Sequence, residues 1–378
     1  MEYVKIGDIC TKVCSGGTPS SGNPSYYEGG SIPWLNTNEV NFCRIYSTEK
    51  KITQLGYENS AAKYIDENSV IVAMYGVTAG KSAIAKIRLT TNQACCNLSI
   101  DGKKADYEYV YYYLKLQSET LNKLANGGAQ QNLNSKIIKD FKIPLPPLAI
   151  QHRIASILSA YDSQIENNQK RIKLLEQMAE NLYKEWFVRF RFPGYENAEF
   201  EGGVPKGWKI EKLGNVANIC TGKCNREDAE EDGIYPLFDR SQEIKKSNSW
   251  LMDCKAIIVP GEGTSFIPRY YEGKFNLHQR CYCVEPIQKG TGKYLFYMLM
   301  FNRAYFLSVA TGATVPSLRL NNFTKMKFIM PSFDLCIKYD KQISMFFNEI
   351  NALTREVELL THQRDLLLPR LMSGKLSI

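Results

Sequence analysis

The sequence predicts an α+β fold with two globular domains in tandem, each followed by a long helix, and with the two helices paired as an antiparallel coiled coil of pseudo-twofold symmetry. Three observations predict this architecture. Short motifs occur twice in the same order along the 378 residues. Each globular part mixes short strand-like runs with a helical segment. Each copy then ends in proline followed by a long apolar heptad pattern.

The internal repeat consists of six pairs of matched segments, and six matches in one order are hard to attribute to chance. The pairs are residues 6–9 with 213–216, Ser15-Gly16 with Thr221-Gly222, residues 70–72 and Gly76 with residues 257–259 and Gly263, Asn92-Gln93 with His278-Gln279, residues 128–130 with 312–314, and Phe141 and Pro144 with Phe328 and Pro331. Each half of the chain is therefore predicted to be one copy of the same unit.

Each globular part contains strand-like runs between turn signals. Such runs occupy residues 69–75, 256–260 and 278–285, and residues 16–19 and 29–30 mark turns. A helix is predicted over residues 107–124, with its counterpart over residues 293–309. The mixture predicts a curled sheet with helices.

A heptad pattern follows each globular part. Pro144, Pro146 and Pro147 cannot lie inside a helix, but proline suits a first helical turn. The first stripe consists of Ile150, Ile154, Ile157, Tyr161, Ile165, Ile172, Leu175, Ala179, Leu182 and Trp186, with polar Asn168 at one position, and ends at Pro193-Gly194. It covers about forty residues, or ~60 Å at 1.5 Å per residue. The second stripe consists of Ile343, Phe346, Ile350, Leu353, Val357, Leu360 and Leu367, with polar Arg364 in the pattern.

Each stripe is narrow, so each helix needs a partner helix. We expect the two stripes of this chain to pair with each other, and the alternative is pairing with another chain. Pro369 is expected to end or kink the second helix.

Five segments are predicted along the chain. They are a first globular domain over residues 1–147, a first helix over 148–192, a linker over 193–207, a second globular domain over 208–333, and a second helix with the C-terminal tail over 334–378. The linker is polar and rich in glycine and proline, as expected between domains.

Composition excludes several classes of protein. The net charge of +8 is spread along the chain, so it permits a polyanionic partner without requiring one. No apolar run is long enough to span a membrane and no signal peptide is evident, so a cytoplasmic protein is expected.

The eleven cysteines are expected to be reduced core thiols. Cys10 with Cys14 and Cys220 with Cys224 lack a second ligand pair at zinc-finger spacing, so neither a metal nor a cofactor is expected.

Catalytic motifs are also missing. The sequence contains no methyltransferase motif, no Gly-x-Ser-x-Gly and no His-Glu-x-x-His. Residues 76–82 resemble a phosphate loop, but only three residues separate Gly76 from Gly80, and residues 83–87 alternate like a strand. A hairpin turn is expected there, with Lys81 facing a DNA phosphate as a second interpretation. The acidic cluster at residues 227–232 is interpreted as a solvated loop and not as a nuclease site, so no catalytic residue is predicted.

Polar loops are the candidates for contact with DNA, because amide, guanidinium and hydroxyl groups recognise base edges while cations hold phosphates. In the first domain the candidates are Thr18, Ser20, Tyr26, Tyr27, Trp34, Asn36, Thr37, Asn38, Tyr75, Lys81, Gln93, Gln130, Gln131 and Asn132. In the second domain they are Lys223, Asn225, Arg226, Arg240, Gln242, His278, Gln279, Arg280, Thr314, Ser317 and Arg319. For any single residue the alternative is an ordinary solvated side chain. That alternative is weakest for loops present in both copies, such as those near Gly128 and Gly312.

The chain resembles the DNA-sequence specificity subunits of type I restriction–modification systems over nearly its whole length. The most specific likeness lies in Pro144-x-Pro146-Pro147-Leu148-x-x-Gln151-x-x-Ile154 leading to Asp162-x-x-Ile165, and in residues 364–374, with Ile32-Pro33-Trp34 and the Gly128 loop in addition. The resemblance implies two target recognition domains that each recognise half of a split site in double-stranded DNA. It implies that the paired helices set the unread spacer, and that two methyltransferase subunits and the restriction and translocation subunits dock on this chain.

Two other functions remain open at this point. One is a coiled-coil scaffold that joins protein partners without recognising DNA. The other is a nucleotide-binding enzyme that uses residues 76–82.

Overall fold

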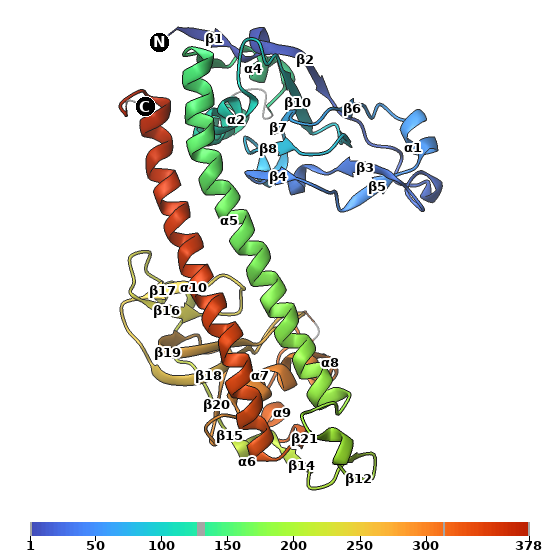
Figure 1. Cartoon of the computed structure of the whole chain (residues 1–378), viewed down its shortest axis with the longest axis vertical. Helices are drawn as coiled ribbons and strands as arrows, with labels where there is room; N and C mark the ends of the chain where they lie inside the picture. The colour runs from blue at the N-terminus through green and yellow to red at the C-terminus, as the bar shows by residue number, and fades with distance from the viewer. Residues whose placement is uncertain (1, 127–132, 313, 377–378) are drawn as a thin grey trace. The chain divides into compact units, whose positions relative to one another are not determined.

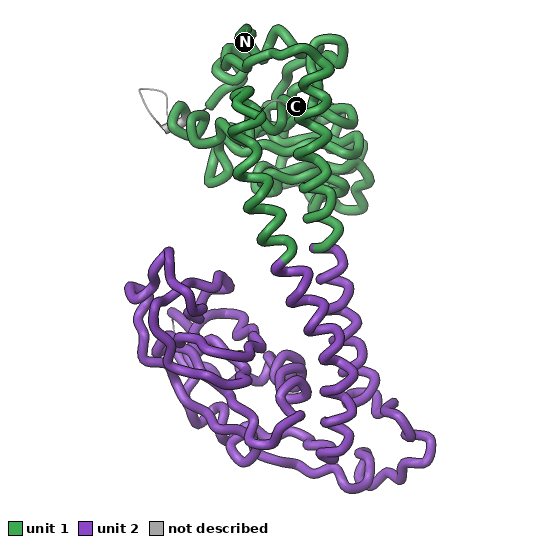
Figure 2. Tube along the Cα trace, turned by 60° about the vertical axis from the view of Figure 1, so that its left-hand side comes forward, with its two compact units in different colours: residues 1–168, 356–378 green, residues 169–355 purple. Residues whose placement is uncertain are grey.

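The computed structural model describes residues 2–126, 133–312 and 314–376 (Figure 1). The chain forms two compact units (Figure 2). Unit 1 comprises residues 1–168 and 356–378, and unit 2 comprises residues 169–355. Each unit is an α+β structure that contains half of each long helix, so the α+β prediction is confirmed.

Unit 1 contains two main sheets. The first has the strand order β2 (Cys10–Ser15), β10 (Cys95–Ile100), β7 (Val70–Ala73), β8 (Ser82–Ala85) and β4 (Cys43–Ile45). The second has the order β5 (Lys50–Ile52), β3 (Ile32–Leu35), β9 (Leu89–Thr91) and β6 (Tyr64–Ile65), and β1 (Tyr3–Lys5) pairs with β11 (Lys142–Pro144). The helices are α1 (Gln54–Glu58), α2 (Tyr107–Leu116), α3 (Ser118–Asn126) and α4 (Ser135–Asp140).

Unit 2 is built around one six-stranded sheet. Its order is β15 (Ala217–Thr221), β20 (Cys281–Pro286), β18 (Met252–Pro260), β19 (Arg269–Leu277), β16 (Tyr235–Phe238) and β17 (Lys245–Ser247). Two small ribbons pair β14 (Lys209–Lys212) with β21 (Lys327–Met330) and β12 (Phe200–Glu201) with β13 (Val204–Pro205). The helices are α6 (Leu213–Val216), α7 (Gly292–Phe301), α8 (Arg303–Val309) and α9 (Leu320–Thr324).

The two units repeat the same core arrangement, as the matched motifs predict. The strand order β2-β10-β7 corresponds to β15-β20-β18. The predicted helix over residues 107–124 forms two successive helices interrupted at Gln117, and its counterpart is interrupted in the same way at Asn302. In both units a completely buried helix face lies over the sheet, with Tyr109 in α2 and Tyr294 in α7 among the buried residues. The duplication is therefore structural as well as sequential.

The long helices are α5 (Leu148–Tyr183), extended by a π-helical turn over Lys184–Val188, and α10 (Phe333–Met372). In unit 1 the start of α5 packs against the end of α10, where Ile154 and Leu158 share a core with Leu371. In unit 2 the end of α5 packs against the start of α10, where Ala179 shares a core with Ile343. The two helices of this chain therefore pair with each other in antiparallel fashion.

Of the two effects expected of Pro369, an end of the second helix at this residue is wrong. Helix α10 continues through Pro369 to Met372. The apolar neighbours Leu368 and Leu371 are 5% and 1% exposed, so packing of these side chains stabilises the last turn although proline removes one backbone donor.

Candidate nucleic-acid interface

Four loops meet at one edge of the strands in each domain. In the first domain the backbone N–H of Asn92 donates to the carbonyl of Leu35 at 3.0 Å. In the second domain the N–H of His278 donates to the carbonyl of Phe238 at 2.9 Å. These bonds extend the parallel pairing of β3 with β9 and of β16 with β19. The loops that follow β3 and β16 therefore lie beside the loops that lead into β10 and β20.

The loops after β7 and β18 join the same edge. Met74 N–H donates to the carbonyl of Ala94 at 2.8 Å, and Gly261 N–H donates to the carbonyl of Arg280 at 2.7 Å. The repeat thus extends to single backbone hydrogen bonds. It also identifies the residues that occupy equivalent positions in the two domains.

Two glycines bring the fourth loop into contact with this edge. A Cβ atom on Gly16 would lie 2.0 Å from the carbonyl oxygen of Thr91, and one on Gly222 would lie 1.9 Å from that of Leu277. Because real Cβ contacts are never this short, only glycine allows the loops after β2 and β15 to pass so close to β9 and β19. The match of Ser15-Gly16 with Thr221-Gly222 therefore marks a structural requirement.

Polar side chains then link the loops in both domains. The hydroxyl of Thr18 donates to Gln93, and Gln279 Nε2 donates to the side-chain oxygen of Asn225 at 2.7 Å. All four side chains are exposed. Each domain thus presents amide and hydroxyl groups on adjoining loops, which are the group types that recognise base edges.

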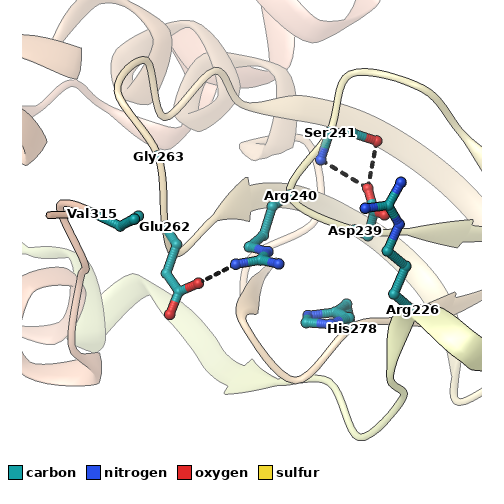
Figure 3. Close-up of a pocket in the computed structure, with 8 residues that line it drawn as sticks. All are labelled: Arg226, Asp239, Arg240, Ser241, Glu262, Gly263, His278 and Val315. Atoms are coloured by element: carbon teal, nitrogen blue, oxygen red, sulfur yellow. Dashed lines mark hydrogen bonds and ion pairs between the residues drawn. The ribbon is translucent and has the colours of Figure 1, made fainter.

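In the second domain these loops enclose a cavity of about 270 Å³ (Figure 3). Its lining residues are Arg226, Asp239, Arg240, Ser241, Glu262, Gly263, His278 and Val315. The Glu262 carboxylate accepts a hydrogen bond from Arg240 Nη1 at 2.5 Å through one oxygen, and its other oxygen forms an ion pair with Arg280 Nη1 at 3.2 Å. One carboxylate is therefore shared by two guanidinium groups, of which that of Arg240 lines the cavity.

Two further side chains of the cavity, Asp239 and His278, have a lowered pKa. Burial alone raises the pKa of Asp239, but hydrogen bonds from Lys245 at 2.8 Å and from Ser241 outweigh burial and lower it to about 2. Burial, followed by the nearby charge of Arg240, lowers the pKa of His278 below its usual 6.5. His278 Nδ1 accepts from the Arg280 N–H at 3.0 Å, so the proton of the neutral ring is on Nε2.

The structure places most of the candidate contact residues at the surface. The exposed ones are Thr18, Ser20, Asn38, Tyr75, Gln93, Lys223, Asn225, Arg226, Arg240, Gln242, Gln279, Arg280, Thr314 and Arg319, and the half-buried ones are Tyr26, Tyr27, Asn36, Lys81 and Ser317. Of the second-domain candidates, the cavity brings together Arg226, Arg240 and His278, and Glu262 adds Arg280. Gln130, Gln131 and Asn132 lie outside the described residues.

Three of the described candidates are buried. His278 is 6% exposed but lines the cavity, whereas Trp34 and Thr37 need correction. Trp34 is 4% exposed and its indole N–H donates to the carbonyl of Gly17 at 2.9 Å. Thr37 is 6% exposed and its hydroxyl accepts from Asn92 Nδ2 at 2.8 Å. These side chains position the loops from inside, and we omit them from the contact surface.

Sequence reasoning missed Glu262 and Asp239 as members of the site. Glu262 directly precedes Gly263, which belongs to a matched segment, and Asp239 directly precedes the candidate Arg240. The sequence signal that could have identified these two residues was their position next to a matched residue or a candidate residue.

The loop at residues 76–82 is a hairpin connection. A short 3₁₀ turn over Gly76–Thr78 leads into β8, which pairs antiparallel with β7, so no helix follows as a phosphate loop requires. The Lys81 ammonium donates to Asn41 Oδ1 at 2.8 Å. The interpretation as a nucleotide-binding enzyme is therefore wrong for this loop.

Other features of the described residues add no chemistry. In the acidic cluster, Asp228 accepts from the backbone N–H of Asn225 at 2.7 Å, as a cap on its own turn.

Over residues 2–126, 133–312 and 314–376, no group of three or more histidine, cysteine or acidic side chains is arranged to hold a metal ion. Among these residues no helix combines the length and apolarity needed to cross a membrane.

Comparison with known proteins agrees with this geometry. The family profile described as "Type I restriction modification DNA specificity domain" matches residues 1–177 and 205–361. The MjaIX specificity subunit of a type I restriction enzyme from Methanocaldococcus jannaschii is 28% identical, over 100% of this chain and 94% of that protein. The MjaVIII specificity subunit from the same organism is 24% identical, over 100% and 93%.

A solved structure has the same fold. The S subunit of a type I restriction–modification system from M. genitalium aligns with a TM-score of 0.65 and 20% identity, over 98% of this chain and 95% of that one. Since the family profile covers most of the sequence in two separate stretches, the chain belongs to the type I restriction–modification DNA specificity family, as a specificity subunit that is not itself an enzyme.

Proposed function

We propose that the chain recognises a bipartite DNA target, with each half-site bound by the four-loop edge of one domain. The target recognition domains would comprise residues 1–147 and 208–333, joined through the linker 193–207. The spacer helices would comprise residues 148–192 and 334–378. Two methyltransferase subunits and the restriction and translocation subunits would dock on this chain in the complete complex.

One observation carries this proposal. The two domains share the same backbone hydrogen bonds and the same close-approach glycines at their loops, but they differ in the side chains these loops present. Two half-sites of different sequence require domains that share one backbone geometry and present different polar groups. A scaffold without DNA recognition would have no need for this duplication of loop geometry.

The length of the paired helices fits their proposed role of setting the unread spacer between the two half-sites. About forty helical residues span ~60 Å, and one turn of B-DNA is ~34 Å, so the length scales of the two are comparable. Within unit 1 the Arg364 guanidinium on α10 donates to Asp162 on α5 at 2.7 Å, and within unit 2 Arg171 pairs with Glu349 at 2.6 Å. These cross-helix ion pairs help to set the register of the pair.

The direct test combines the chain with the methyltransferase subunits of its system and a methyl donor, and then determines which adenines or cytosines of genomic DNA are methylated. We expect one split motif with a constant gap. Methylation without a motif, alongside a stable protein complex, would contradict the proposal and favour the scaffold function. Binding of the complex to its motif should also weaken steeply with salt, because phosphate contacts release counterions.

A further inference from the structure

We infer that Arg240 and Arg280, oriented by the shared carboxylate of Glu262, recognise guanine in the half-site of the second domain. The inference rests on the proposed function, because it assigns a base to one of its two half-sites. It concerns the chemistry of the cavity in Figure 3 and the residues that determine its specificity.

The carboxylate of Glu262 is a fixed support. Its side chain is 14% exposed, whereas those of Arg240 and Arg280 are 46% and 57% exposed. The backbone on either side of Glu262 is also held. Gly261 accepts from Leu318 N–H at 2.8 Å, and Gly263 N–H donates to the Pro316 carbonyl at 3.0 Å. The Glu262 carboxylate is therefore held in place, and the two guanidinium groups beside it are exposed to solvent.

Fixed orientation distinguishes base recognition from phosphate binding. The carboxylate of Glu262 holds both Arg240 and Arg280, and Asp239 in the same cavity is paired with Lys245. Flexible cations suffice for phosphates, which carry no sequence information. A guanidinium group held against a carboxylate gains directional specificity. This arrangement favours contact with a base edge.

The donor pattern selects guanine. In the major groove guanine presents two acceptors, O6 and N7, which match two N–H groups of one arginine. Adenine presents an amino donor beside N7, cytosine presents an amino donor, and thymine presents one acceptor beside a methyl group. An arginine has five N–H donors. Glu262 engages Nη1 of each side chain, by a hydrogen bond from Arg240 and by an ion pair with Arg280, so a donor pair remains on each guanidinium group. The neutral His278 ring, with its proton on Nε2, adds a donor to the cavity without adding charge.

The first domain lacks an equivalent of Arg240 and Arg280 held by Glu262. The matched backbone bonds make Tyr75 equivalent to Glu262 and Ala94 equivalent to Arg280, and Arg240 corresponds to buried Thr37. No cation occupies any of these three positions in the first domain. The inference therefore confines this arginine-based recognition of guanine to the half-site of the second domain.

The test compares methylation motifs for complexes that contain Arg240→Ala, Arg280→Ala, Arg240→Lys and Glu262→Gln. Lysine keeps the charge of Arg240 but cannot form two parallel bonds, and glutamine keeps the size of Glu262 but removes its charge. At one or two guanine positions of a single half-site, we expect preference for guanine to fall about 5- to 150-fold, with the other half-site unchanged. The Glu262→Gln complex should bind nonspecific DNA at least as tightly as the parent, because the loops become more positive.

Lys255→Ala is the matched control, since Lys255 pairs with Glu272 at an exposed position of the same unit and lies outside the four loops. It should leave the motif intact, and thermal unfolding of every variant identifies those that fail to fold. The inference is overturned if the affected half-site contains no guanine, if the arginine variants keep the full motif, or if they weaken binding equally for all bases. Absence of any split motif with the parent chain would instead contradict the proposed function itself.

Discussion

Replacing Tyr183 with alanine is expected to destabilise unit 2 by about 3–5 kcal/mol, which is the usual cost of removing a large buried aromatic side chain. Tyr183 is 5% exposed and lies in the last turn of α5. Its ring centroid lies 5.4–6.5 Å from those of Phe187, Tyr294, Tyr297, Phe301 and Tyr339, which come from α7, α10 and the π-helical turn. Alanine would leave a cavity where the helix pair meets the second domain.

Thermal unfolding measures this effect, and roughly 2–4 °C is lost per kcal/mol in a unit of this size. Leu174→Ala is the matched control, because Leu174 lies on the same helix and in the same unit but is 58% exposed. The control should change stability by less than about 0.5 kcal/mol. Equal midpoints for the two variants would show that the aromatic cluster does not hold the helix pair to the domain.

Replacing Asp162 with alanine is expected to cost unit 1 about 1–3 kcal/mol, because buried donors lose their shared acceptor. The charges of the two arginines stay compensated in part, since Arg44 keeps Glu108 and Glu166 and Arg364 keeps Asp365. Asp162 accepts from Tyr112 at 2.6 Å, from Arg44 at 3.3 Å and from Arg364 at 2.7 Å. The side chains of Asp162, Arg44 and Arg364 are 7%, 5% and 11% exposed. The carboxylate thus joins the first domain, α5 and α10.

The pH dependence of this variant is a second readout. Burial alone raises the pKa of Asp162, but Lys115, Tyr112 and Arg364 outweigh burial and hold it below 3.8. A depressed folded-state pKa stabilises the protein above the unfolded value, and this contribution is lost as pH falls through the folded value. The difference between parent and variant should therefore be constant between about pH 7 and pH 5 and shrink below about pH 4. A difference that grew with acid would contradict this account.

Asp140→Ala provides the control for the ion pair. Asp140 pairs with Lys5 at 2.8 Å, but the two side chains are 47% and 53% exposed. Water and salt screen exposed pairs, which contribute little to stability, so this variant should unfold close to the parent temperature.

Periodicity and repetition predicted the architecture because both are properties of the order of residues. Ile154, Ala179 and Ile343 lie in the heptad stripes and are all buried in the helix pair. Pro369 does not end α10, because buried Leu368 and Leu371 continue the last turn beyond it. Local helix-breaking tendency was weaker there than tertiary packing.

The site was harder to predict because composition does not show which side of a loop faces solvent. Trp34 and Thr37 have suitable polar groups, yet strand pairing directs Trp34 inward and a buried hydrogen bond from Asn92 holds Thr37. Glu262 gains its role only because the strand register places Arg240 and Arg280 beside it, and these residues are separated in the sequence. Such juxtapositions follow from the folded sheet and not from spacing along the chain.

The central claim is that two domains bind two half-sites while the helix pair sets the gap between them. Its most direct test inserts one heptad into each long helix, between Asn168 and Gln169 in α5 and between Arg355 and Glu356 in α10. These points are the borders of the two compact units, so the contacts inside each unit are retained. A heptad inserted into only one helix should disrupt the pairing and serves as the control.

The measurement is the methylation motif of the reconstituted complex with the doubly lengthened chain. Seven helical residues add ~10 Å, which corresponds to about three base pairs of DNA. We predict a wider gap between two half-sites whose bases are unchanged. A motif with an unchanged gap, or with altered bases in either half-site, would contradict the division of labour between the domains and the helix pair.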